Sequence, residues 1–476
     1  MVDLTLYKCQ GIDTREAWSE KDIYVLDEGD NIQILPGGAI ASRPACIKVC
    51  DLSTSSVGLY ARGGLLRSLV ASGLSVQQTA PTEVVYDPIG QGGTFDYSGK
   101  IGRIVGAETF GTSQVYGPHG YIAFKRIDTA LVEHHWIKEP PASGATFTST
   151  KVALPFQPGE ALTKVDTKLV ATDPANGYFR YSSSLSADDW TSVGDAGFEA
   201  ALQFVSGSRE ITALGVHRSS LAVFYSDAVQ LWFMDPVPAN IYRKEVMSGP
   251  GTTFPKSVAN VYGDAYFLSN GVFSTLATAT TVGQADYTDA GIKIKTLTST
   301  IPSTAQVNGV WSQKRGQYLV AVDSQIYCFG FYPAANEKSW TRWQMPETID
   351  YLVENNGVVY YRSGNVLYRL DDAVGRDSGV ATDIAWNVLT IEMGFGRSQS
   401  RIKALNEIVA KNTARCTYTP IVDGRELTSH RVVFPASTST IRSHFSGSGR
   451  RIAVRMAGTG LMRIDGIAMA AEVCGI

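Results

Sequence analysis

Two copies of one short pattern, adjacent to each other between Ile211 and Leu276, constrain the fold more than any other feature. The first copy reads ALGVHRSSLAVFYSDAVQLWF and the second reads SVANVYGDAYFLSNGVFSTL. Each has three apolar runs rich in Val, Phe, Tyr and Leu, which favour strands. Gly, Asn, Asp and Ser fill the gaps, where tight turns need positive φ or side-chain hydrogen bonds to the backbone. Three antiparallel strands in about 20 residues, repeated once, predict consecutive blades of a β-propeller.

The same unit recurs along most of the chain. It is found again at Val307–Phe331 and Ile349–Leu370, and upstream from Ala161 and from Val57. The first turns of these units are roughly 40–55 residues apart, which is the spacing of propeller blades. The pattern therefore predicts six or seven blades over residues 52–375, although no Gly-His…Trp-Asp signature is present.

The repeated blade pattern of the sequence ends before Arg376. Six short strand-like segments follow within about a hundred residues, which is typical of a small β-sandwich. We expect residues 376–476 to form a C-terminal platform domain of this kind, and residues 1–51 to be N-terminal strands packed with it. The fold class is thus predicted to be all-β, a six- or seven-bladed propeller plus a β-sandwich-like platform.

Composition excludes several classes of protein. The net charge is −3, so the chain as a whole is not a basic nucleic-acid binder. No run of 18 apolar residues and no apolar leader is visible, which predicts neither a membrane anchor nor a signal peptide. Cys46 and Cys50, in one probable strand, would lie roughly 13 Å apart, too far for a disulfide. The six cysteines are expected to be free thiols.

No motif predicts catalysis, a cofactor or a metal. The Gly-rich stretch at Gly90–Gly102 fails the spacing of a phosphate-binding loop and lacks its hydroxyl. His134 and His135 are adjacent in a probable strand, so their side chains point to opposite faces and do not share one metal ion easily. The segment SLSADDW at Ser184–Trp190 resembles the Asp-box turn of sialidase-type propellers with its Gly missing, and that turn is structural. We therefore expect the protein not to be an enzyme.

Four residues near the N-terminus carry a resemblance to a known family. Asn31, Gly38, Arg43 and Pro44, followed by a small residue, match a pattern of Asn, Gly, an apolar residue and Arg-Pro. At the front of a repetitive β protein this pattern resembles the tail tubular or nozzle proteins of short-tailed bacteriophages. These are also called packaged-DNA stabilisation or head-completion proteins. The two strand units between Ile211 and Leu276, and the alternating strands at the C-terminus, resemble the corresponding parts of that family in the same order.

The resemblance implies a virion structural protein without enzymatic activity. Such a protein is made in the host cytoplasm and assembles in the virion tail as a homo-hexameric ring that extends the portal and adaptor channel. The ring retains packaged DNA, lets double-stranded DNA pass without sequence-specific binding, and docks tail fibres or a needle. The alternative, based on the propeller and the Asp-box-like turn, is a carbohydrate-binding or sialidase-like propeller.

Charge is divided unevenly between the two predicted domains. Residues 376–476 contain 13 Lys and Arg but 8 Asp and Glu, a net of five positive charges, whereas residues 1–375 carry a net of eight negative charges. A basic domain suits docking on an acidic protein neighbour, and the other interpretation is a solvated sheet face. We take Arg397, Arg401, Arg450 and Arg451 as candidate platform contacts, and Trp232 and Phe267, from the most apolar strands, as propeller-core residues.

Overall fold

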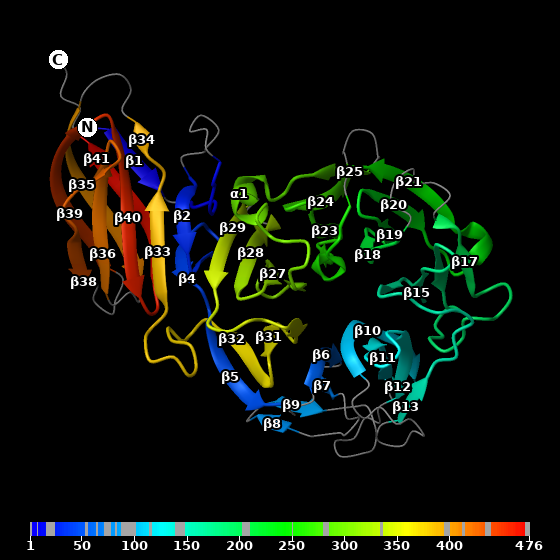
Figure 1. The fold of residues 1–476 in the computed structure, drawn as a ribbon. Coiled ribbons are helices and arrows are strands. Elements are labelled where there is room, and N and C mark those ends of the chain that lie inside the picture. Colours follow the sequence, from blue (N-terminus) through cyan, green and yellow to red (C-terminus); the bar gives the residue numbers. More distant parts are fainter. Residues whose placement is uncertain are drawn as a thin grey trace.

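The computed structural model is almost entirely β (Figure 1). It describes residues 2–6, 8–15, 24–52, 56–62, 65–70, 78–80, 83–86, 101–113, 117–138, 148–201, 210–249, 251–278, 285–333, 337–394, 400–411, 415–433 and 439–471. Within these ranges the helices are three short 3-10 turns and one α-helix, in the order η3 (Pro238–Asn240), η4 (Pro255–Ser257), η5 (Ile292–Ile294) and α1 (Lys295–Thr298).

A ring of seven four-stranded blades makes up most of the molecule (Figure 1). The inner strands β6, β10, β14, β18, β22, β26 and β30 pack against one another in this order, and β30 returns to β6, so the ring is closed. The expected β-propeller is confirmed, and of the six or seven blades left open by the sequence the structure has seven.

The blades follow one another along the chain. From the inner to the outer strand, blade 1 contains β6 (Ser56–Arg62), β7 (Leu65–Val70), β9 (Glu83–Tyr86) and β8 (Gln78–Ala80); blade 2 contains β10 (Ile101–Ser113), β11 (Gly117–Arg126), β12 (Val132–Lys138) and β13 (Thr148–Lys151); blade 3 contains β14 (Leu162–Val165), β15 (Lys168–Asp173), β16 (Tyr178–Tyr181) and β17 (Gly197–Glu199); and blade 4 contains β18 (Ala213–His217), β19 (Ser220–Phe224), β20 (Ala228–Phe233) and β21 (Tyr242–Ser248).

The last three blades are made in the same way, except that the outer strand of the seventh comes from the N-terminal part. Blade 5 contains β22 (Ala259–Val261), β23 (Asp264–Ser269), β24 (Val272–Thr278) and β25 (Ala285–Thr288); blade 6 contains β26 (Val307–Ser312), β27 (Gln317–Val322), β28 (Gln325–Tyr332) and β29 (Glu337–Gln344); and blade 7 contains β30 (Tyr351–Asn355), β31 (Val358–Ser363), β32 (Val366–Asp371) and β5 (Ala45–Asp51).

The placement of β5 corrects the expectation that residues 1–51 as a whole pack with the platform. Strand β5 pairs antiparallel with β32, from Ala45 opposite Asp371 to Asp51 opposite Val366. An N-terminal strand that completes the last blade closes the ring by hydrogen bonds between the two ends of the propeller sequence. This pairing covers the edge of β32, and an unpaired strand edge is a liability in β proteins.

The platform consists of two packed sheets (Figure 1). One sheet contains β3 (Ile32–Ile34), β4 (Ile40–Ser42), β41 (Arg463–Ala471), β35 (Ser400–Lys411) and β39 (Ser439–Gly449), with β1 (Val2–Leu6) also paired to β41. The other contains β2 (Leu26–Asp30), β33 (Ala385–Thr390), β40 (Arg451–Thr459), β36 (Arg415–Val422) and β37 (Arg425–Glu426), with β34 (Met393–Gly394) on β40 and β38 (His430–Val433) on β36. Ile32, Val388, Tyr418, Val454 and Ile464 fill the space between them, as expected for a β-sandwich-like domain.

The second platform sheet is continuous with the propeller. Strand β2 pairs parallel with β29 of blade 6 through Asp30 and Arg342, and antiparallel with β33 of the platform. One sheet of 11 strands therefore runs from the inner strand of blade 6 to the outer edge of the platform.

Candidate interdomain junction

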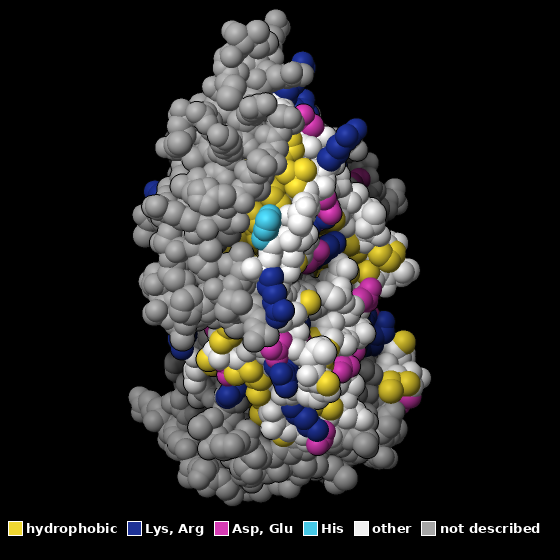
Figure 2. Space-filling view, turned by 90° about the vertical axis from the view of Figure 1, so that its left-hand side faces the viewer, with side chains coloured by type: hydrophobic (Ala, Val, Ile, Leu, Met, Phe, Trp, Pro, Cys, Tyr) yellow, Lys and Arg dark blue, Asp and Glu magenta, His cyan; other side chains and the backbone are white. Residues whose placement is uncertain are grey.

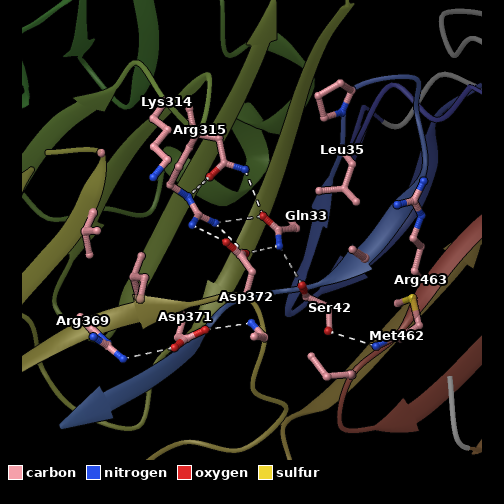
Figure 3. A pocket seen from close by; sticks show the side chains of 18 of the residues that line it. Gln33, Leu35, Ser42, Lys314, Arg315, Arg369, Asp371, Asp372, Met462 and Arg463 are labelled. Carbon is pink, nitrogen blue, oxygen red and sulfur yellow. Dashed lines mark hydrogen bonds and ion pairs between the residues drawn. The ribbon is translucent and has the colours of Figure 1, made fainter. Parts of the chain in front are cut away.

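A groove of about 1000 Å³ lies where blades 6 and 7 meet the platform (Figure 3). Its walls come from the β3–β4 hairpin, from the turns of blades 6 and 7, and from the start of β41. The cations Lys314, Arg315, Arg369 and Arg463 line it together with Asp371 and Asp372. The groove is thus a polar, mixed-charge space between two domains.

Arg315 is at the centre of a hydrogen-bond network on the groove wall (Figure 3). Its guanidinium donates to both carboxylate oxygens of Asp372, at 2.6 and 2.9 Å, and its Nε donates to Gln317 Oε1 at 2.8 Å. Gln33 of β3 donates to Asp372 Oδ1 at 2.9 Å and to the Ser42 carbonyl at 3.1 Å. Burial raises the pKa of Asp372, but the hydrogen bonds and charge of Arg315 outweigh it and hold that pKa below its usual value. The network joins blade 6, the segment after blade 7 and the β3–β4 hairpin.

Asn31 sits at the turn between β2 and β3 with φ of 56°, a left-handed conformation that Asn tolerates better than most residues. Its Nδ2 donates to the Ala385 carbonyl of the platform at 2.8 Å. Its Oδ1 accepts from the Gln344 N–H of blade 6 at 2.7 Å and from Arg43 Nε at 3.1 Å. One amide side chain therefore bonds to the platform, to the propeller and to the chain between them.

Arg43 forms a buried ion pair with Asp377. Its Nη1 and Nη2 donate to the two carboxylate oxygens at 3.0 and 2.6 Å, and only 4% and 7% of the two side chains are exposed. Cys46 N–H donates to the same carboxylate at 2.8 Å. Burial raises the pKa of Asp377, but the hydrogen bonds and charge of Arg43 lower it by more than burial raises it. The pKa is therefore below its usual value and the carboxylate is ionised. Burial and the nearby Asp377 raise the pKa of Cys46 to about 12, which keeps this thiol protonated.

Gly38 and Pro44 complete the four-residue motif. Gly38 has φ of +81°, and a Cβ there would lie 2.5 Å from Lys8 Cα, so the tight approach of the two backbones requires glycine. The Gly38 carbonyl accepts from the Cys9 N–H at 3.1 Å. Pro44 offers its carbonyl to Arg43 Nη1 at 2.9 Å. Asn31 and Arg43 thus bond across the junction, whereas the contacts of Gly38 and Pro44 stay within the N-terminal segment.

Of the four candidate platform arginines, the structure describes the side chains of two. Arg450 and Arg451 are exposed at the start of β40, and their N–H groups donate to Asp423. The guanidinium of Arg451 lies 3.6 Å from Glu392. Arg401 belongs to β35, where only the backbone is described, and Arg397 falls outside the described residues. On the side of the molecule in Figure 2, the described cations are interspersed with carboxylates and do not form one basic patch.

Trp232 and Phe267 lie inside the propeller. Trp232 is 4% exposed, donates its Nε1–H to Gln230 and meets the Phe179 ring edge-on with centroids 5.1 Å apart. Phe267 is fully buried against Phe224, with ring centroids 4.9 Å apart. The two side chains belong to neighbouring clusters between blades 3 and 4 and between blades 4 and 5.

The other sequence motifs occupy structural positions. His134 and His135 are buried in β12 and point to different partners, Tyr121 and Phe124. In the Asp-box-like turn, Asp189 accepts from the N–H groups of Thr191 and Ser192. Trp190, in the same turn, is buried. Over the ranges that the structure describes, no three metal-ligating side chains converge. The Gly-rich stretch lies almost wholly within residues 87–100, outside those ranges.

The sequence missed the partners that give the junction its geometry. Asp377 is 334 residues from Arg43, and Arg315 is 282 residues from Gln33. No spacing rule connects residues so far apart, so only the tertiary fold reveals these pairs. The arrangement can hold domains together and can bind a polar partner in the groove.

No family model and no curated protein sequence matches the chain. Solved structures that resemble it are propellers of low similarity. BamB from Moraxella catarrhalis has 11% identity and a TM-score of 0.40 over 70% of this chain and 97% of its own. A putative 6-phosphogluconolactonase from Bacteroides uniformis has 11% identity and a TM-score of 0.41 over 64% and 87%. An exo-β-1,3-galactanase from Phanerochaete chrysosporium has 10% identity and a TM-score of 0.21 over 71% and 93%. In the part of this chain that the structure describes, no helix has the length and apolar character needed to cross a bilayer.

Proposed function

We propose that this chain is a structural subunit of a ring-shaped tail nozzle in a short-tailed bacteriophage virion. Six copies would form a hexamer below the portal and adaptor, extend the DNA channel, retain packaged double-stranded DNA and dock tail fibres or a needle. The observation that carries the proposal is the position of Asn31, Gly38, Arg43 and Pro44. Asn31 and Arg43 of the motif that resembles this family bond across the junction between propeller and platform, and Gly38 and Pro44 shape the N-terminal segment beside them.

Stiffness is what such a ring requires of its subunits. A wall that retains DNA under pressure works by geometry, so its domains must keep their relative orientation. Here a shared sheet, the buried Arg43–Asp377 pair and the Asn31 amide join the two domains. The uneven charge adds support, since the negative residues 1–375 suit a channel wall that must not hold phosphates.

The decisive experiment is electron microscopy of the purified protein mixed with portal–adaptor complexes. We expect a ring of six subunits on the adaptor, with the platform toward it. The double variant Arg450→Glu and Arg451→Glu should lose this assembly, because it reverses two exposed platform charges. Arg218→Glu, on a propeller turn with 53% of its side chain exposed, is the matched control and should still assemble. A protein that remains monomeric beside the complexes contradicts the proposal.

A carbohydrate-binding propeller is the second candidate. It is favoured by the stacked rings of Tyr178 and Phe198, whose centroids lie 4.8 Å apart, with Phe198 half exposed and Arg180 over its face. Half of the Phe198 side chain is exposed, and a partly exposed aromatic ring suits contact with a sugar ring. Glycan-array binding that disappears in Phe198→Ala, together with failure to assemble on portal complexes, would favour this candidate.

A further inference from the structure

Two loops of the propeller expose large apolar side chains. Leu185 and Val193 lie between β16 and β17 of blade 3, and Val237 lies between β20 and β21 of blade 4. Their side chains are 61%, 103% and 54% exposed. Apolar side chains that remain together in water on a folded surface mark sites of interaction. We call these two loops the propeller tip.

Ser184 holds the two loops of the propeller tip together. Its hydroxyl lies 3.3 Å from the Pro236 carbonyl oxygen of blade 4 and 3.0 Å from Asp195 Oδ1 of its own loop. Leu185, which follows it, has φ of 60°, a left-handed conformation that is unfavourable for a bulky residue. A hydrogen bond from the Leu185 N–H to the Thr167 carbonyl, at 2.8 Å, keeps it there. The fold therefore fixes an apolar side chain in solvent at a cost in backbone strain, which suits a role in recognition.

Carboxylates without a basic partner flank the apolar side chains of the tip. Asp188 is exposed and accepts from the Ser186 hydroxyl at 2.9 Å. Asp235 accepts from the Val237 N–H at 2.8 Å and from the Asn240 side chain at 3.3 Å. In the part of the chain that the structure describes, neither carboxylate has an ion-pair partner. The tip thus combines apolar groups with negative charge.

The groove between the platform and blades 6 and 7 offers the complementary groups (Figure 3). Arg369 on its wall is 37% exposed and lies 3.5 Å from Asp371. Lys314 is exposed on the same wall, and its aliphatic chain lies against Gly357, where a Cβ would be 2.3 Å from Lys314 Cδ. Over the described ranges no carboxylate pairs with the Lys314 ammonium. The groove also has an apolar part, formed by Leu35, Pro36, Leu461 and Met462.

The tip and the groove lie far apart in one subunit. The groove is beside β4 and β32, whereas β17 and β21, next to the tip, lie on the far side of the propeller ring (Figure 1). A tip therefore cannot reach the groove of its own chain. A contact between two different surfaces of identical subunits is heterologous, and such contacts produce either closed rings or open filaments.

We propose that the propeller tip of one subunit docks in the groove of the next. Asp188 and Asp235 face the cations Lys314 and Arg369, and the exposed apolar side chains of the tip meet the apolar part of the groove. Opposite charges speed the encounter and fix its register, while apolar burial stabilises the contact. The inference rests on the ring proposed above and assigns the contact that closes it.

The test is electron microscopy of full-length variants mixed with portal–adaptor complexes. Asp188→Lys and Lys314→Glu, each alone, should reduce the fraction of adaptors that carry a ring at least about tenfold, because like charges then face each other at every contact. Both positions are exposed, so melting temperatures near that of the wild type show that the variants are folded. Asp227→Lys is the matched control, since this exposed carboxylate is also in blade 4 but at the other end of β20, and its rings should form as in the wild type.

An equal mixture of the Asp188→Lys and Lys314→Glu variants should regain rings. In a ring where the two variants alternate, each positive tip meets a negative groove and each unchanged tip meets an unchanged groove. Rings of six accommodate this alternation.

Two results would overturn the docking of tip in groove while leaving the nozzle intact. One is wild-type rings that persist in both single variants. The other is loss of rings in both variants without recovery in the mixture, which would mean that tip and groove contact other partners. Failure of the wild type to form rings on the adaptor would instead contradict the nozzle itself, and this inference with it.

Discussion

Arg43 and Asp377 join the two places where the backbone passes between propeller and platform. Arg43 precedes β5, the outer strand of blade 7, and Asp377 follows β32, to which β5 is paired. Their two hydrogen bonds, at 3.0 and 2.6 Å, lie in a buried environment. A single ion pair thus fixes the entrance of the chain into the propeller beside its exit.

Replacing Arg43 by Ala should destabilise the protein by about 3–5 kcal/mol, because it leaves the buried Asp377 carboxylate without its counter-charge. Urea unfolding followed by tryptophan fluorescence measures the loss. Arg376→Ala is the control, since its ion pair with Asp383 is exposed on both sides and should be worth no more than about 1 kcal/mol. Equal effects of the two substitutions would contradict the importance of burial.

Phe267→Ala should cost about 3–5 kcal/mol, as expected when a fully buried aromatic side chain is removed from a packed core. Phe198→Ala removes a ring of the same size that is 50% exposed, and should cost less than about 1 kcal/mol. Differential scanning calorimetry of the two variants compares them directly. If Phe267→Ala melts at the wild-type temperature, the packing between blades 4 and 5 described above is wrong.

Acid should destabilise the protein through His134. Burial, assisted by the neighbouring His135, lowers the pKa of His134 from 6.5 to about 3. Between these values the unfolded chain binds a proton that the folded chain does not, so stability rises with pH over this window and is lost as pH falls. The slope from this residue is about 1.4 kcal/mol per pH unit.

His134→Phe removes that contribution. The unfolding free energies of wild type and variant, measured from pH 7 to pH 4, should differ in slope by this amount below pH 6.5, with the wild type steeper. The Tyr121 hydroxyl, 2.9 Å from His134 Nδ1, loses its partner in the variant at every pH and shifts the whole curve without changing its slope. Parallel curves would show that His134 titrates alike in the folded and unfolded chains.

Removal of residues 1–51 should open the ring. The shortened chain lacks β5, so β32 becomes an unpaired edge and the buried side chains of Tyr360 and Leu367 lose part of their cover. We expect loss of cooperative thermal unfolding and aggregation, detected by light scattering. A chain starting at Lys8 loses only β1 of the platform and should keep a cooperative transition, while a cooperative transition in the longer deletion would argue that blade 7 closes by itself.

Local patterns in the sequence predicted the blades because each hairpin is made by residues that are close in the sequence. The turns at Arg218–Ser219 and Tyr262–Gly263 have the positive φ angles that their polar residues indicate. The pairing of β5 with blade 7 was not predicted, because its apolar pattern fits a platform strand as well as a blade strand. Its partner β32 lies more than 300 residues along the chain, and only the closing of the ring selects it.

The candidate site could be predicted only in part, because its partners are also distant in the sequence. The motif pointed to Asn31, Gly38, Arg43 and Pro44 as a group, but gave no partner for the guanidinium.

The continuous sheet through β29, β2 and β33 limits how the molecule can move. A swing of the propeller away from the platform would have to separate β2 from β29, release Asn31 from both Gln344 and Ala385, and pull the Trp343 indole from the Ile32 carbonyl. No hinge of a few backbone torsions can do this. In the ring proposed above, opening of the passage must therefore come from loops or from displacement of whole subunits, each moving as one rigid body.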